Sequence, residues 1–145
     1  MSDPGAARPV SKYALEITLP LAVLVAIASL GGLLRPEHYE LETADWATQS
    51  TAQDVVNLFL ILPVFTIAGL FIRRGERLAE PIWGGSLLYL IYTFIIYCFA
   101  IHFNKLFLVY VASLGLSAWG FVYFIWHQQR WQTVQRLMSV KVARV

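Results

Sequence analysis

Residues 55–72 read VVNLFLILPVFTIAGLFI, an apolar run without a charged side chain, and further apolar runs occupy residues 15–34, 82–101 and 106–126. Each run has about 18 to 21 residues, enough for an α-helix to cross a hydrocarbon core about 30 Å thick. The chain has 145 residues, of which 58% are hydrophobic and 14% are charged. The sequence therefore predicts an all-α membrane protein, with a four-transmembrane-helix bundle as one integral membrane domain over residues 1–145.

Lysine and arginine residues gather on one side of the predicted membrane, which marks that side as cytoplasmic. They precede the first run, follow the last, and include Arg73, Arg74 and Arg77, which we expect to contact lipid headgroups. Both termini should therefore be cytoplasmic, and the acidic connection over residues 35–54 should be external, with Trp46 and Tyr39 at headgroup depth. The net charge of +2 is spread along one membrane face, so it does not indicate a nucleic-acid site.

The connections predict how the helices begin and pair. Ser50 with Gln53, or Thr51 with Asp54, has the spacing of a capping box and predicts a helix start there. Pro63 lacks an amide proton and predicts a kink near the middle of the second span. The last two spans are joined by so few residues that we expect an antiparallel hairpin in direct contact.

Polar residues of the third run share one helix face, because successive residues turn by about 100°. The fourth run has its own narrow face of small and polar residues, with Ser113 and Ser117 in small-xxx-small spacing. These faces either pack helices together or line a polar ligand pocket. They consist of Ser86, Tyr89, Thr93, Tyr97 and Asn104 at the third run, and of Tyr110, Ser113, Ser117 and Gly120 in the fourth.

The candidate ligand-binding or proton-relay residues lie at similar predicted depth near the external interface, where polar groups are costly unless paired. Asp54 with His102 could relay a proton or hydrogen-bond a quinone or a lipid headgroup. The structural alternative is that Asp54 caps a helix while His102 forms part of a tight turn. The full set is Asp54, Asn57, Tyr97, His102 and Asn104.

The sequence requires no cofactor and supplies no recognisable catalytic arrangement. Cys98 is the single cysteine, so no intramolecular disulfide forms, and no Cys/His box indicates a metal site. The first run is too long for a signal-peptide core, and we expect it to remain as an uncleaved anchor. Residues 127–145 predict a cytoplasmic amphipathic helix that lies on the membrane or docks onto a partner, with a solvated tail as the alternative.

Several stretches resemble a pattern in an uncharacterised family of bacterial integral membrane proteins with four or more helices. They include AQDVVNL over residues 52–58, LLYLIYT over 87–93 and HFNKLF over 102–107. The resemblance implies a bacterial inner (cytoplasmic) membrane and implies no activity.

These observations favour a non-catalytic accessory or structural subunit of a larger bacterial membrane complex, with an energy-transducing complex as one option. An autonomous binder of a small hydrophobic ligand, such as a quinone or a lipid, is the first alternative. A homo-oligomeric channel or proton-coupled carrier is the second. The expected partners are the lipid bilayer and other membrane subunits or further copies of this chain, without nucleic acid.

Overall fold

The computed structural model describes the backbone of residues 9–142 and the side chains of residues 13–35 and 37–128. Four of its helical stretches are long and apolar enough to cross a membrane, which confirms the predicted all-α architecture. The elements are α1 (Pro9–Leu34), η1 (Pro36–Tyr39), α2 (Ala44–Val56), η2 (Asn57–Ile61), α3 (Leu62–Arg73), α4 (Ala79–Phe99) and α5 (Phe107–Val142).

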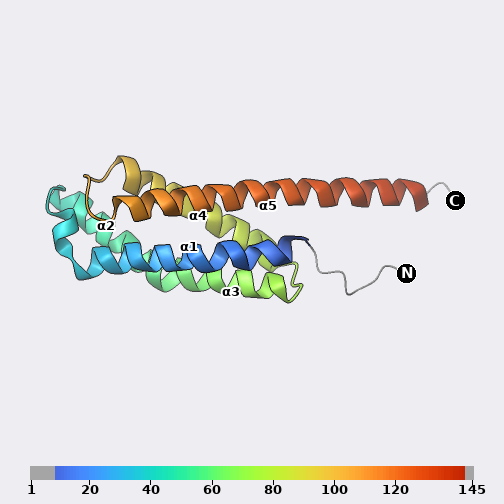
Figure 1. The fold of residues 1–145 in the computed structure, drawn as a ribbon, viewed down its shortest axis with the longest axis horizontal. Helices are drawn as coiled ribbons and strands as arrows, with labels where there is room; N and C mark the ends of the chain where they lie inside the picture. Colours follow the sequence, from blue (N-terminus) through green and yellow to red (C-terminus); the bar gives the residue numbers. More distant parts are fainter. Residues whose placement is uncertain (1–8, 143–145) are drawn as a thin grey trace.

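The long helices lie side by side and alternate in direction, so that α1 begins and α5 ends on the same side of the bundle (Figure 1). Helices α1 and α4 each pack against both α3 and α5. The contact between α4 and α5 confirms the predicted hairpin. We call the end with residues 35–43 and 100–106 the η1 end, and the opposite end, with residues 73–78, the arginine end.

Helix α2 begins at Ala44, so the predicted start at Ser50 or Thr51 is wrong. The Thr43 side chain caps the helix instead, because its hydroxyl accepts a hydrogen bond from the Trp46 amide at 3.4 Å. The Thr51 hydroxyl donates to the Ala47 carbonyl within the helix, at 2.8 Å. Much of the acidic connection is therefore helical, and α2 continues through η2 into α3.

Pro63 follows directly on a turn of π-helix, η2, rather than on a regular α-helix. The Leu62 amide donates to the Asn57 carbonyl, the five-residue spacing of a π turn. Because Pro63 has no amide proton, the regular hydrogen-bond ladder is interrupted at this point in any case. Close to the predicted kink, the structure thus has a widened turn that begins at Asn57.

Trp83 is the centre of the core in the half of the bundle nearer the arginine end, and its side chain is fully buried. Its indole Nε1 donates to the Thr18 hydroxyl of α1 at 2.8 Å. Its ring stacks on Phe65 of α3, with centroids 6.0 Å apart, and meets Phe124 of α5 edge-on. One side chain thus joins all four long helices, and its polar group is satisfied away from water.

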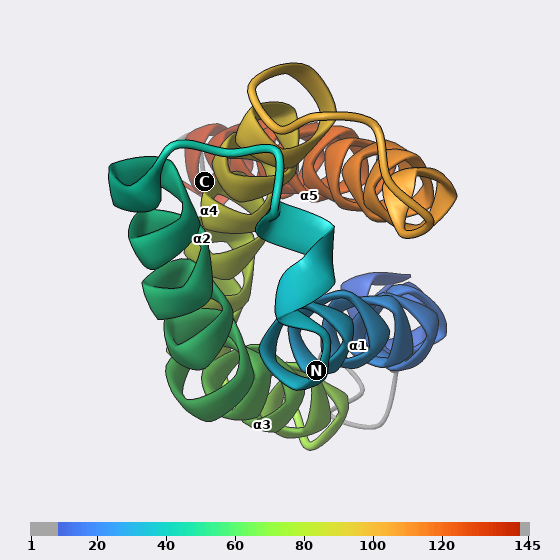
Figure 2. The ribbon, with the colours of Figure 1, turned by 90° about the vertical axis from the view of Figure 1, so that its left-hand side faces the viewer.

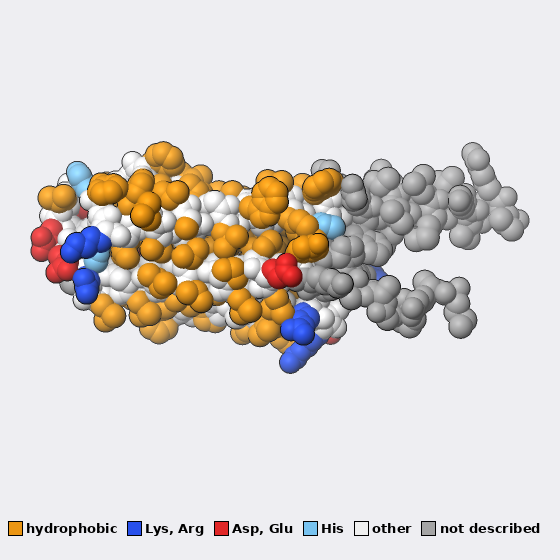
Figure 3. All heavy atoms as spheres, in the orientation of Figure 1, with side chains coloured by type: hydrophobic (Ala, Val, Ile, Leu, Met, Phe, Trp, Pro, Cys, Tyr) orange, Lys and Arg blue, Asp and Glu red, His pale blue; other side chains and the backbone are white. Residues whose placement is uncertain are grey.

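The outer surface has the pattern of a membrane helix bundle. Hydrophobic side chains cover the middle of the face in Figure 3, whereas charged side chains gather toward its ends. Helix α5 has 36 residues and extends well beyond the other helices (Figure 1). The predicted tail helix is continuous with α5 as far as Val142. The residues of its predicted amphipathic face are ones whose side chains the structure does not describe.

Candidate functional site

Asp54 lies at the η1 end with its carboxyl group fully enclosed, although it is the most polar side chain in its helix turn. The Tyr39 hydroxyl donates to Oδ2 at 2.7 Å, and the Tyr97 hydroxyl lies 2.8 Å from Oδ1. Tyr97 also approaches the Ser50 carbonyl at 3.3 Å. Both carboxyl oxygens therefore have a hydroxyl partner, as a buried carboxyl group requires.

Tyr39 reaches Asp54 from η1, which lies across the η1 end between α1, α2 and α4 (Figure 2). The side chain is buried within the bundle. Burial, together with the nearby Tyr97 and Asp54, raises the pKa of Tyr39 above its ordinary value of 10.0. The hydroxyl therefore stays protonated and remains a donor to the carboxyl group.

Gly32 provides the space that the carboxyl group occupies. A Cβ atom at this position would overlap with Asp54 Oδ2 and would lie 2.6 Å from the Tyr39 hydroxyl. No larger residue fits there without displacing one of the two groups. The last turn of α1 is thus shaped to the Asp54–Tyr39 contact.

Gln53 forms a second polar network beside Asp54. Its amide Nε2 contacts the hydroxyl of Tyr89, lies 3.3 Å from Thr93 Oγ1, and lies 3.4 Å from Asn57 Oδ1. Asn57 is fully buried, and its Nδ2 has no partner among the described residues. The polar face of α4 therefore points toward α2, and Tyr97 connects it to Asp54.

Two grooves flank α2, and each is lined by one of the tyrosines that bind Asp54. The α2–α4 groove has a volume of about 180 Å³ and is lined by Trp46, Gln49, Ser50, Gln53, Tyr92, Thr93, Ile96 and Tyr97. The α1–α2 groove has a volume of about 490 Å³ and includes Gly32, Tyr39, Thr48 and Thr51. Tyr39, Asp54 and Tyr97 thus form a hydrogen-bonded chain from one groove to the other.

His102 does not pair with Asp54, so that proposed relay is corrected. Its ring Nδ1 lies 2.9 Å from Glu42 Oε1, and its backbone amide donates to the same oxygen at 2.6 Å. The His102 side chain is 61% exposed, whereas Asp54 is enclosed. Burial favours a higher pKa for Glu42, but the hydrogen bonds from His102 outweigh it and hold the pKa below the ordinary 4.5.

Asn104 forms part of the turn between α4 and α5. Its Oδ1 accepts a hydrogen bond from the Leu106 amide at 2.9 Å. The Tyr110 ring lies further inside, edge-to-face with Tyr97 at 5.0 Å between centroids. The five candidate residues therefore separate into a buried set, formed by Asp54, Asn57 and Tyr97, and a loop set, formed by His102 and Asn104.

The other polar residues of α4 and α5 mostly bond within their own helices. Ser86 donates to the Ile82 carbonyl, and Ser113 and Ser117 donate to carbonyls four residues earlier. A Cβ at Gly120 would lie 3.0 Å from Ile17 Cγ2 and 3.3 Å from Leu87. Gly120 thus allows close packing of α5 on α1 and α4.

The sequence did not identify three residues that form polar contacts at the η1 end. Tyr39 and Glu42 stand in the acidic connection, and Gln53 was considered only as a cap. Recognising Thr43-Ala44-Asp45 as a helix start would have put Gln53 and Asp54 deep in a long helix, facing the bundle. Nothing in the local sequence indicates that Tyr39 turns inward.

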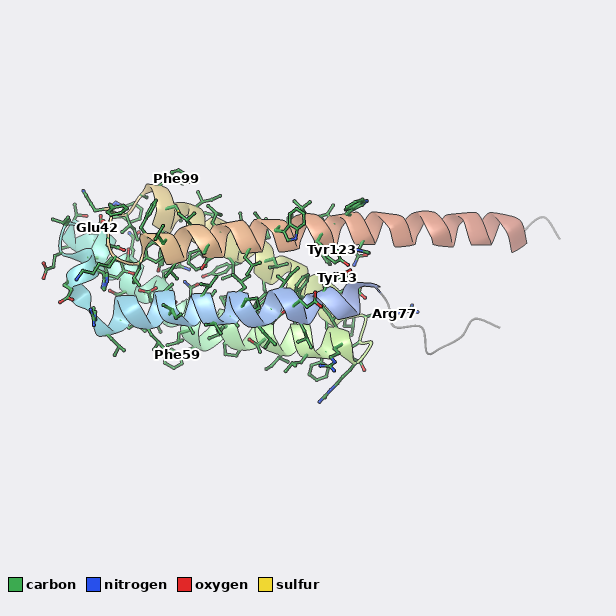
Figure 4. The ribbon with its side chains drawn as sticks, in the orientation of Figure 1. Tyr13, Glu42, Phe59, Arg77, Phe99 and Tyr123 are labelled. Carbon is green, nitrogen blue, oxygen red and sulfur yellow. The ribbon has the colours of Figure 1, made fainter. Side chains whose placement is uncertain are left out.

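Arg73, Arg74 and Arg77 are exposed at the arginine end, far from this site; Figure 4 labels Arg77 and Glu42 at opposite ends. In the described part of the chain, no group of His, Cys, Asp and Glu residues could hold a metal ion. The chain shows no match to a protein-family model, a curated protein or a solved structure.

Proposed function

We propose that this protein binds a small amphipathic ligand, such as a quinone, in the α2–α4 groove. The observation that supports this best is the lining of the groove, which combines amide and hydroxyl groups with aromatic and aliphatic walls. Ligand sites in proteins typically combine an apolar lining with a few fixed polar groups. The groove belongs to a bundle whose helices are long and apolar enough to cross a membrane, where such ligands concentrate.

The groove assigns separate roles to its walls. Gln49 carries an amide donor for a ligand carbonyl, whereas the Gln53 amide nitrogen already contacts Tyr89, Thr93 and Asn57 and forms a fixed part of the wall. Trp46 and Ile96 supply surfaces for a ring. The volume of about 180 Å³ lies below the ~300 Å³ of drug-sized pockets, so it suits one ring with its chain outside.

Binding of a short-chain quinone to the purified protein in nanodiscs tests this proposal. Gln49→Leu should weaken binding about fivefold, because it removes a donor worth roughly 1 kcal/mol. Thr48→Val, in the α1–α2 groove, is the matched control and should leave the affinity unchanged. Equal affinities for wild type, Gln49→Leu and Trp46→Ala would refute the proposal, as would no binding to the wild type.

A second candidate is a non-catalytic accessory subunit of a larger membrane complex, and the length of α5 favours it. At about 1.5 Å per residue, its 36 residues extend about 54 Å, well beyond a hydrocarbon core of about 30 Å. A helix extending from the bundle is a suitable docking element for a partner. Native mass spectrometry of the gently extracted assembly should then show other protein chains. A lone chain or a homo-oligomer would contradict the accessory-subunit proposal.

We further propose that the η1 end faces outward, that both termini are cytoplasmic, and that the membrane is a bacterial inner membrane. The position of Arg73, Arg74 and Arg77 at the end where α1 begins and α5 ends supports this orientation. The resemblance to bacterial multi-span membrane proteins supports the choice of membrane.

A further inference from the structure

A third groove runs between α3 and α4 near the arginine end, away from the site described above. Its volume is about 330 Å³, and nearly all of its lining is apolar, including Val64, Ile67, Phe71, Leu78 and Ile82. Leu78 is 81% exposed, and Ile67 and Ile82 are each 51% exposed. The groove therefore presents an apolar surface that is open along the side of the bundle, where lipid would lie.

Basic side chains stand at one end of this groove. Arg73, Arg74 and Arg77 are exposed, and among the described residues none of them forms an ion pair with a carboxylate. The guanidinium carbon of Arg74 lies 5.5 Å from the ring centroid of Phe71, which lines the groove. That contact joins the cationic end directly to the apolar wall.

The turn that carries these arginines is fixed by its backbone. Gly75 has a φ of +88°, a left-handed conformation that glycine adopts without strain. The Gly75 amide donates to the Ile72 carbonyl at 3.0 Å, and the Glu76 amide donates to the Phe71 carbonyl at 3.1 Å. The arginines are thus presented on a defined turn rather than on an open loop.

The acidic residues nearby leave an excess of positive charge. Glu76 lines the groove and Glu80 follows one turn later, so the three arginines and these two carboxylates sum to +1. Glu80 accepts a hydrogen bond from Gln128 of α5 at 3.0 Å, which directs it toward that helix. An occupant that matches the site has an apolar chain and an anionic head.

We propose that the α3–α4 groove binds an acidic phospholipid, with an acyl chain along the groove and its phosphate on Arg74 and Arg77. Guanidinium groups bind phosphate oxygens through paired, charge-assisted hydrogen bonds. Anionic lipids are attracted to basic residues at the membrane surface, and the apolar groove adds specificity for one lipid position. The site is independent of the quinone proposal, since it lies at the other end of the bundle.

Native mass spectrometry of lipids retained by the full chain tests this inference, after release from nanodiscs of equal parts phosphatidylglycerol and phosphatidylcholine. We expect phosphatidylglycerol to be retained at least tenfold over phosphatidylcholine. The double variant Arg74→Gln/Arg77→Gln should abolish this preference. Arg35→Gln/Lys105→Gln, which removes the same charge at the η1 end, should preserve it.

A second pair of variants tests the groove itself. Ile82→Trp should fill the groove and reduce retention about tenfold, whereas Leu88→Trp, at an equally exposed position of α4 outside the lining, should not. Glycerol phosphate, the headgroup without acyl chains, should not displace the lipid. The proposal would be overturned by equal retention of both lipids, or by loss of the phosphatidylglycerol preference in Arg35→Gln/Lys105→Gln. It would also be overturned if Ile82→Trp retained the lipid as wild type does, if glycerol phosphate displaced the lipid, or if a second protein chain occupied the groove.

Discussion

At the scale of single residues, the Asp54 carboxyl group is held by two hydroxyl groups that come from opposite sides of α2. Tyr39 approaches from η1 and Tyr97 from α4. Two segments far apart in sequence are thus joined through one carboxyl group. Their hydroxyls satisfy a group that is costly to enclose alone.

Removing one of these hydroxyls should destabilise the fold. Tyr39→Phe leaves Asp54 Oδ2 without its donor, and an unsatisfied buried polar group costs about 1–3 kcal/mol. Tyr92→Phe alters an exposed hydroxyl and should change stability little. Chemical unfolding in detergent micelles measures both, and equal stability of the two variants would show that the Tyr39 contact contributes nothing.

Gly32→Ala should also destabilise, because the new methyl group meets the Asp54 carboxyl group and the Tyr39 hydroxyl. Overpacking of this kind costs typically about 1–3 kcal/mol. Gly115→Ala is the matched helical control, since a Cβ there meets nothing within 4 Å. The control should be neutral or stabilising by up to about 1 kcal/mol. Unfolding curves in the same detergent measure both variants, and equal stabilities of Gly32→Ala and Gly115→Ala would refute the predicted clash at Gly32.

The sequence was sufficient to predict that Asp54 and Tyr97 lie at similar depth, because both follow from hydropathy and helix direction. It could not predict Tyr39 as their partner, since the conformation of a short connection depends on tertiary contacts. The predicted pairing of Asp54 with His102 failed for the same reason. The His102 ring nitrogen instead contacts Glu42, which belongs to that connection.

At the scale of elements, Glu42 links the connection before α2 to the turn after α4. Both the amide and the ring nitrogen of His102 contact one Glu42 oxygen. This contact stabilises the fold when Glu42 is ionised, because the hydrogen bonds favour the carboxylate and lower its pKa. Its contribution is fully present above the ordinary value of 4.5 and is lost as the pH falls through the lower folded-state value.

Glu42→Gln should therefore lower the melting temperature at pH 7, and the difference from wild type should shrink below about pH 4.5. Glu40→Gln, an exposed neighbour, should leave the melting temperature at pH 7 unchanged. Thermal melting of the three proteins between pH 3 and pH 7 measures this. A difference that stays constant over this range would contradict the assigned contact between Glu42 and His102.

The apolar runs predicted the existence of the long helices well, but not the start of α2. Residues 44–54 are polar enough to read as a connection, and the capping signal at Thr43 is weaker than that of a full capping box. Pro63 predicted a kink, and the structure has a π turn over Asn57–Ile61 directly before this region. The choice of a π turn at Asn57 could not be predicted, since it depends on packing in the bundle.

At the scale of the whole molecule, consecutive long helices are also neighbours in space. Helices α1, α3, α4 and α5 form a closed ring of contacts, with Trp83 joining them inside. Short connections and alternating direction make this arrangement predictable from the sequence. The rotation of each helix was not predictable, which is why the polar face of α4 was not assigned to α2 in advance.

We propose that these helices cross a membrane with the η1 end outside and the arginine end inside. Labelling of single cysteines by a membrane-impermeant maleimide in intact cells tests it directly, in a Cys98→Ala background that removes the native thiol. We predict that Glu40→Cys is labelled in intact cells, whereas Arg77→Cys is labelled only after permeabilisation. Labelling of both positions from outside, or the reverse pattern, would contradict this orientation.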